Sequence, residues 1–118
     1  MSTLLEIHEV VAFLAALCAI IFSWNARGRR VVSAVVALQF VLGLAIAAVM
    51  GAQHLAMPAL LWLHLLIGIA VLAAYGLAMR FGKQAGGAST TLALSVAGLV
   101  LILVNIYLGL QMAGMLPS

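Results

Sequence analysis

Few side chains of this sequence have the chemistry to bind a metal ion or to carry protons: Glu6, His8, Glu9, His54 and His64. His64 lies inside an almost unbroken apolar run from Pro58 to Arg80, which is long enough to cross a bilayer as a helix. An imidazole in such a run needs a proton partner, a metal ion or water, because an unpaired polar group in hydrocarbon is costly. His64 is therefore the first candidate for a functional site.

A second histidine, His8, can complete a site with His64. Two facing histidines can supply both axial ligands of a heme iron. Small residues beside each ligand leave room for a flat ring, and Ala12 and Gly68 each lie one helical turn after a histidine. We therefore predict a heme b site with His8 and His64 on the iron and with Ala12 and Gly68 beside them. Structural histidines without a cofactor, and a non-heme metal or proton-handling site, are the alternatives.

The composition indicates the class of protein to which this chain belongs, and so the kind of fold that holds the two histidines. Of the 118 residues, 68% are hydrophobic and 6% are charged, far outside the range of a soluble domain. We expect an all-α integral membrane four-helix bundle with up-down topology, embedded in a lipid bilayer. It forms one transmembrane domain, residues 1–118, with helices at about 3–24, 31–51, 58–80 and 90–112. Pro58 suits the first turn of the third helix.

The basic residues predict the orientation of the bundle, because all five fall in the two connections at one end: Arg27, Arg29, Arg30, Arg80 and Lys83. By the positive-inside rule that end is cytoplasmic, so both termini face outward. We expect a multi-pass protein of a bacterial or archaeal cytoplasmic (inner) membrane. The net charge of +3 reports this topology, and we expect no nucleic-acid partner.

With this topology the two histidines are expected at a similar depth. The first and third helices run in the same direction, and His8 and His64 each lie one to two turns below the outer end. In an up-down bundle these helices are diagonal neighbours, whose facing side chains hold cofactors. His54 is expected above the pair, where it either reaches a heme propionate or a quinone oxygen or is a solvated loop residue. Glu9 either moves protons or binds a cation within the membrane, or lies at the interface.

Two stripes at helical spacing are expected to face inward, and they are Gln39, Gly43, Ala47, Gly51 and His54 on the second helix and Ser95, Gly98, Asn105 and Gly109 on the fourth. Small residues and interhelical amide hydrogen bonds are typical of packing faces in membrane bundles. No internal repeat is evident along the chain. The single cysteine, Cys18, excludes an intrachain disulfide.

From His8 to about Leu72 the order of features resembles the heme A synthase family. The matching segments are HEVVAFLAALCAIIFSW, a basic loop, LQFVLGLAIAA, a short outer connection and LHLLIGIAVL. The resemblance implies that His8 and His64 are axial heme ligands. Members of the family typically carry an acid three residues before the first histidine, whereas this chain has Leu5 there. Because that acid is missing, the resemblance leaves open whether the chain has the family's oxidoreductase activity.

The expected function is that of a membrane heme b-binding protein, in electron transfer or heme handling. Its expected partners are a larger respiratory or quinone-linked membrane complex, a second copy of the chain, or quinone. One alternative is an accessory or structural subunit of a larger complex that holds no cofactor. The other is a small proton-coupled cation or drug exporter that uses Glu9.

Overall fold

The computed structural model describes residues 2–54 and 59–114, which form four long helices without strands in those two ranges. The helices are α1 (Ser2–Phe22), α2 (Ala26–Ala52), α3 (Ala59–Phe81) and α4 (Ala88–Ala113). All four are long and apolar enough to cross a membrane. The all-α four-helix membrane fold predicted from the sequence is therefore confirmed. Pro58, expected in the first turn of the third helix, lies outside the described residues.

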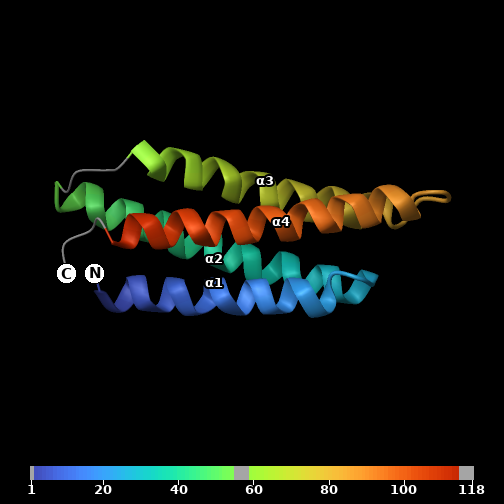
Figure 1. Ribbon diagram of the computed structural model, residues 1–118, viewed down its shortest axis with the longest axis horizontal. Coiled ribbons are helices and arrows are strands. Elements are labelled where there is room, and N and C mark those ends of the chain that lie inside the picture. The colour runs from blue at the N-terminus through green and yellow to red at the C-terminus, as the bar shows by residue number, and fades with distance from the viewer. Residues whose placement is uncertain (1, 55–58, 115–118) are drawn as a thin grey trace.

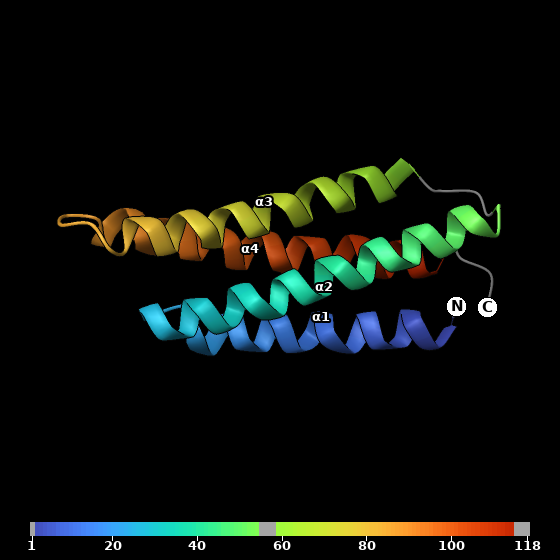
Figure 2. The same ribbon diagram turned by 180° about the vertical axis from the view of Figure 1, so that it is seen from behind.

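The helices run up and down, so that α1 starts and α4 ends at the same end of the bundle (Figure 1). Each helix packs on its neighbours in the order α1, α2, α3, α4 and back to α1, which places α1 and α3 on a diagonal. Packing is closer within the α1–α2 and α3–α4 hairpins than between α1 and α4, as the view from behind also shows (Figure 2). The molecule is therefore two helical hairpins laid side by side.

The start of α2 differs from the expected boundary. The helix begins at Ala26 instead of residue 31, because the Asn25 side chain accepts a hydrogen bond of 2.7 Å from the backbone N–H of Gly28 and caps the helix. A Cβ at Gly28 would overlap the carbonyl oxygen of Phe22, so the turn between α1 and α2 needs glycine there. The prediction of a basic loop is wrong in this detail, since its three arginines belong to the first turns of α2. The other helix ends fall within two residues of those expected.

A fully buried aromatic residue, Tyr75 of α3, joins three helices in the basic half of the bundle. Its hydroxyl oxygen is 2.8 Å from the buried Oγ of Ser23, directly after α1. Its ring lies on Gly98 of α4, where a Cβ would come within 2.7 Å of a ring carbon. Ser23 is held by a second contact, because Arg29 of α2 donates a hydrogen bond of 3.2 Å to its backbone oxygen. Specific contacts therefore fix the half of the bundle that lies away from the histidines.

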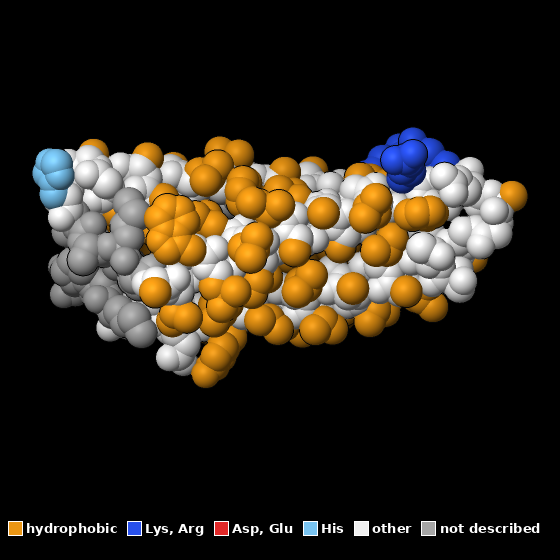
Figure 3. Space-filling view, turned by 90° about the horizontal axis from the view of Figure 1, so that it is seen from above, with side chains coloured by type: hydrophobic (Ala, Val, Ile, Leu, Met, Phe, Trp, Pro, Cys, Tyr) orange, Lys and Arg blue, Asp and Glu red, His pale blue; other side chains and the backbone are white. Residues whose placement is uncertain are grey.

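The outer flanks of the bundle are apolar. Large side chains such as Trp62 and Leu66 are more than 60% exposed, and apolar side chains cover the flank seen in Figure 3. The bundle is 50 Å long, and a bilayer with its headgroups is about 40–45 Å thick. The protein is accordingly a multi-pass membrane protein whose flanks contact lipid and whose ends reach the headgroup layers.

Candidate cofactor-binding site

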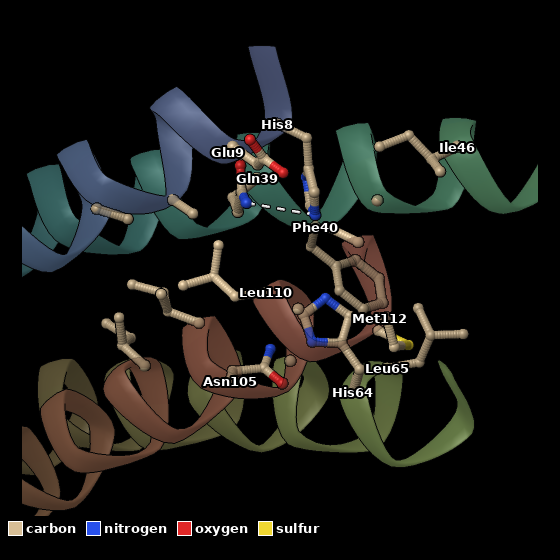
Figure 4. Close-up of a pocket in the computed structure, with 18 of the residues that line it drawn as sticks. His8, Glu9, Gln39, Phe40, Ile46, His64, Leu65, Asn105, Leu110 and Met112 are labelled. Atoms are coloured by element: carbon tan, nitrogen blue, oxygen red, sulfur yellow. Dashed lines mark hydrogen bonds between the residues drawn. The ribbon is translucent and has the colours of Figure 1, made fainter. Parts of the chain in front are cut away.

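His8 of α1 and His64 of α3 point toward one another across a pocket between the helices (Figure 4). The centroids of the two rings are 6.2 Å apart, and the ring planes are nearly perpendicular, at 84°. Both side chains are half-buried. The diagonal arrangement of α1 and α3 thus brings together the two histidines that the sequence singles out.

The spacing of the rings fits two imidazoles on opposite sides of one metal ion. A bond between a metal ion and an imidazole nitrogen is about 2 Å long, which puts two opposed ligand nitrogens about 4 Å apart and their ring centres about 6 Å apart. In Figure 4 one nitrogen of each ring is turned toward the other ring. The spacing of the two ring centres is therefore compatible with a metal ion between the histidines.

Each histidine ring lies against a glycine of the next helix. A Cβ at Gly43 of α2 would be 3.2 Å from Cε1 of His8, and a Cβ at Gly109 of α4 would be 3.3 Å from Cε1 of His64. These distances are tighter than most real contacts of a Cβ atom, so a larger residue at either position pushes the ring. The two glycines therefore help to set the positions of the histidines.

A carboxamide stands one helical turn before each of these glycines. Nε2 of Gln39 is 3.4 Å from Nε2 of His8, to which it donates a long hydrogen bond, and Asn105 faces the His64 ring (Figure 4). Among the described residues, the side-chain oxygens of Gln39 and Asn105 and Nδ1 of both histidines are buried without a hydrogen-bond partner. Such groups are uncommon in proteins, and here they gather at one pocket. The pocket therefore has polar groups available for a bound molecule.

The two hairpins repeat this arrangement. In each, the first helix carries a histidine, and the second carries a carboxamide followed four residues later by the glycine beneath the ring. The sequences of the second helices match at this point, with LQFVLGL at 38–44 and VNIYLGL at 104–110. The expectation of no internal repeat is thus corrected. The pattern Gln/Asn-x-x-Leu-Gly-Leu was the signal that could have assigned Gln39 with Gly43, and Asn105 with Gly109, to the histidine site; the rest of the two predicted stripes lies outside the pocket.

The pocket is narrower than a heme requires. Its volume is about 130 Å³, whereas pockets for drug-sized ligands measure about 300–1,000 Å³. Ala12 and Gly68 line it as expected, but the space beside Gly68 is filled by the ring of Phe40, whose Cδ2 would lie 3.2 Å from a Cβ at Gly68. Sequence reasoning did not identify Phe40. A macrocycle between the histidines therefore requires the Phe40 side chain to turn away.

The remaining candidates divide between the pocket and the surface. Glu9 is half-buried and lines the pocket, while Glu6 is exposed. His54 is exposed, follows the end of α2 with a left-handed φ of 55°, and is not among the pocket-lining residues. Its backbone N–H donates to the carbonyl oxygen of Gly51, so its observed role is to end α2.

The described residues contain no group of three or more histidine, cysteine or acidic side chains that could hold a metal ion. Two histidines are too few for a bare ion that needs four protein ligands, but they complete the coordination of an iron that a macrocycle already holds. A two-histidine donor set is therefore compatible with the predicted heme site, which stays a prediction.

Fold and site together define a multi-pass four-helix membrane bundle with a histidine pair in a pocket between its diagonal helices. Comparisons with protein-family models, with curated proteins and with solved structures find no match for this chain. The resemblance to the heme A synthase family stays a prediction from the sequence.

Proposed function

We propose that this protein is a membrane heme b-binding protein with His8 and His64 as the axial iron ligands. The observation that carries the proposal is the distance of 6.2 Å between two facing imidazole rings on diagonal helices. When bound, heme supplies one-electron redox chemistry. The proposed role is electron transfer or heme handling beside a respiratory or quinone-linked complex of a bacterial or archaeal cytoplasmic membrane, with the histidine end facing outward.

The chain's own residues would bind the iron, shape the cavity and keep water out. Apolar side chains from all four helices line the pocket, among them Val71 and Ile102, so the site has a low dielectric constant that favours a buried macrocycle. Every lysine and arginine lies in the segments at the other end. The propionates of a heme would therefore be solvated at the histidine end instead of paired with basic side chains.

The test is the absorption spectrum of the purified protein, oxidised and reduced with dithionite. The wild type is expected to show the Soret and α bands of a bis-histidine heme. His8→Ala and His64→Ala should each lower heme content at least tenfold, because a ligand is lost. His54→Ala is the matched control and should keep the wild-type spectrum, because His54 lies outside the pocket. A folded His64→Ala protein with unchanged heme content would disprove the assignment.

A second candidate is proton-coupled export of a cation, because Glu9 lines the same pocket as the histidines. An ionisable carboxyl group within a membrane helix is a candidate proton carrier. The expected result is cation efflux from proteoliposomes that depends on a proton gradient and disappears in Glu9→Gln. Glu6→Gln is the control, since Glu6 is exposed. Wild-type protein that shows no efflux would eliminate this candidate.

A further inference from the structure

The basic end of the bundle contains a second concave site, between the start of α2 and the end of α3. It has a volume of about 420 Å³ and is lined by Ala26, Arg29, Arg30, Gly76, Met79, Arg80, Gly82 and Lys83. Figure 3 shows basic side chains gathered at one end of the bundle. Four of the five basic residues of the chain therefore line one site, and Arg27 is the fifth.

Arg29 is held in place within this site. Its side chain crosses from α2 to the segment after α3, where Nη2 would lie 3.2 Å from a Cβ at Gly82. Nη1 donates a hydrogen bond to the backbone oxygen of Ser23, while Nε is buried and has no partner among the described residues. An ordered guanidinium with unused donors is suited to binding a phosphate group.

No acidic side chain neutralises these charges. The two acidic residues of the chain, Glu6 and Glu9, both lie in the first half of α1, at the histidine end. Arg29 and Arg30 also lie in the first turns of α2, where the helix dipole adds positive potential. The local field of the site therefore favours an anion.

The position of the site along the bundle indicates the source of that anion. The hydrocarbon core is about 30 Å thick, so the ends of a bundle 50 Å long lie among the lipid headgroups. Basic pockets between membrane helices at this depth bind anionic headgroups. A phospholipid phosphate is available there at high local concentration.

We propose that the cleft between the start of α2 and the end of α3 binds the phosphate of an anionic phospholipid, with Arg29, Arg80 and Lys83 as its principal cationic contacts. The bound lipid links the two helical hairpins at the end where α2 and α3 meet. This proposal does not depend on heme binding at the opposite end.

The experiment is thermal unfolding of the full chain in neutral detergent micelles with added phosphatidylglycerol. Anionic lipid is expected to raise the melting temperature of the wild type by several degrees, since a ligand of the folded state stabilises it. Phosphatidylcholine should give no comparable shift. In Arg29→Gln/Arg80→Gln both positive charges are removed. The phosphatidylglycerol concentration needed for the same rise in melting temperature should then increase about 25-fold, at roughly fivefold per charge.

Arg27→Gln is the control for loss of charge alone, because it removes one positive charge from the same helical turn outside the cleft, and it should weaken binding less than a single substitution of Arg29, Arg80 or Lys83. If the double variant does not fold, Lys83→Gln replaces it, because Lys83 is exposed in the α3–α4 connection and should still weaken binding. The proposal is overturned if Arg27→Gln loses as much binding as the cleft variants. An equal shift with phosphatidylcholine, or with sodium phosphate at the same concentration, also overturns it.

Discussion

At the scale of single residues, the glycines beneath the histidine rings give a direct test of the site. In Gly43→Ala and Gly109→Ala the new methyl group presses on Cε1 of His8 or His64 and must displace the ring by a few tenths of an ångström. We expect each variant to fold and to lose about tenfold or more in heme affinity, because ligand geometry tolerates little displacement. Heme titration of the purified protein, followed by the Soret band, measures this.

Gly76→Ala is the control for both variants. A Cβ at Gly76 meets nothing within 4 Å, so heme affinity should equal that of the wild type. The alanine should also stabilise α3 by about 0.5–1 kcal/mol, because glycine loses more backbone freedom in a helix. If Gly43→Ala and Gly109→Ala bound heme as tightly as Gly76→Ala, the two rings would not be positioned by the glycines.

Replacing Gln39, unlike replacing the two glycines, is not expected to lower heme affinity. Its amide donates to the same His8 nitrogen that a metal ion would bind, so iron and Gln39 compete for that atom. We expect Gln39→Leu to bind heme at least as tightly as the wild type. Comparing dissociation constants in parallel titrations tests this, and a tenfold loss in the variant would mean that Gln39 supports the bound state instead.

The residues of the site differ in how far the sequence could predict them. His8 and His64 stand out because charged or polar side chains are rare in such apolar helices, and helix direction and rise then place them at one depth. Phe40 could not be predicted, because it is one of many apolar residues and its effect depends on the direction of its side chain into the space beside Gly68. The spacing of residues in the sequence predicts which face of a helix points into the bundle, whereas the packing of side chains decides how much space remains in the pocket.

At the scale of helices, the contact between Tyr75 and Gly98 fixes the packing of α3 on α4. In Gly98→Ala the added methyl group would lie 2.7 Å from the Tyr75 ring, so the helices must separate or the ring must move. Such overpacking costs about 1–3 kcal/mol. We expect a lower melting temperature in detergent, and a Gly98→Ala protein as stable as the wild type would show that α3 and α4 shift freely.

The hydrogen bond between Tyr75 and Ser23 predicts a smaller effect on the same helices. Tyr75→Phe keeps the ring but leaves the buried Ser23 hydroxyl without its partner at 2.8 Å. The expected loss is about 1 kcal/mol of unfolding free energy. Equilibrium unfolding in mixed micelles measures it, with Tyr107→Phe as the control because that tyrosine is 62% exposed.

The helices themselves were predictable because spans of apolar residues report membrane helices directly. The start of α2 was not, since arginines in a first turn oppose the helix dipole and favour a loop assignment. The Asn25 cap and the tight turn at Gly28 outweigh that cost in the structure. Asn25, a cap residue two positions before Arg27, was therefore the better guide to the boundary.

At the scale of the whole molecule, the two hairpins place unlike chemistry at the two ends of the bundle. One end holds the histidine pocket and both acidic residues, and the other holds all five basic residues. Since α1 starts and α4 ends at the histidine end, the termini report which side of the membrane that pocket faces (Figure 1). If the proposed heme is bound, the orientation of the chain therefore decides which compartment its redox partner occupies.

The positive-inside rule predicts that the basic end is cytoplasmic and the histidine end faces outward. Alkaline phosphatase fused after α4 should then be active, and green fluorescent protein at the same position should be dark, because each folds on one side only. Replacing all five basic residues by glutamine removes the bias and should give both signals, since no lysine or arginine then distinguishes the two ends. A bright fluorescent fusion of the wild type would place the pocket on the cytoplasmic side and require a cytoplasmic redox partner.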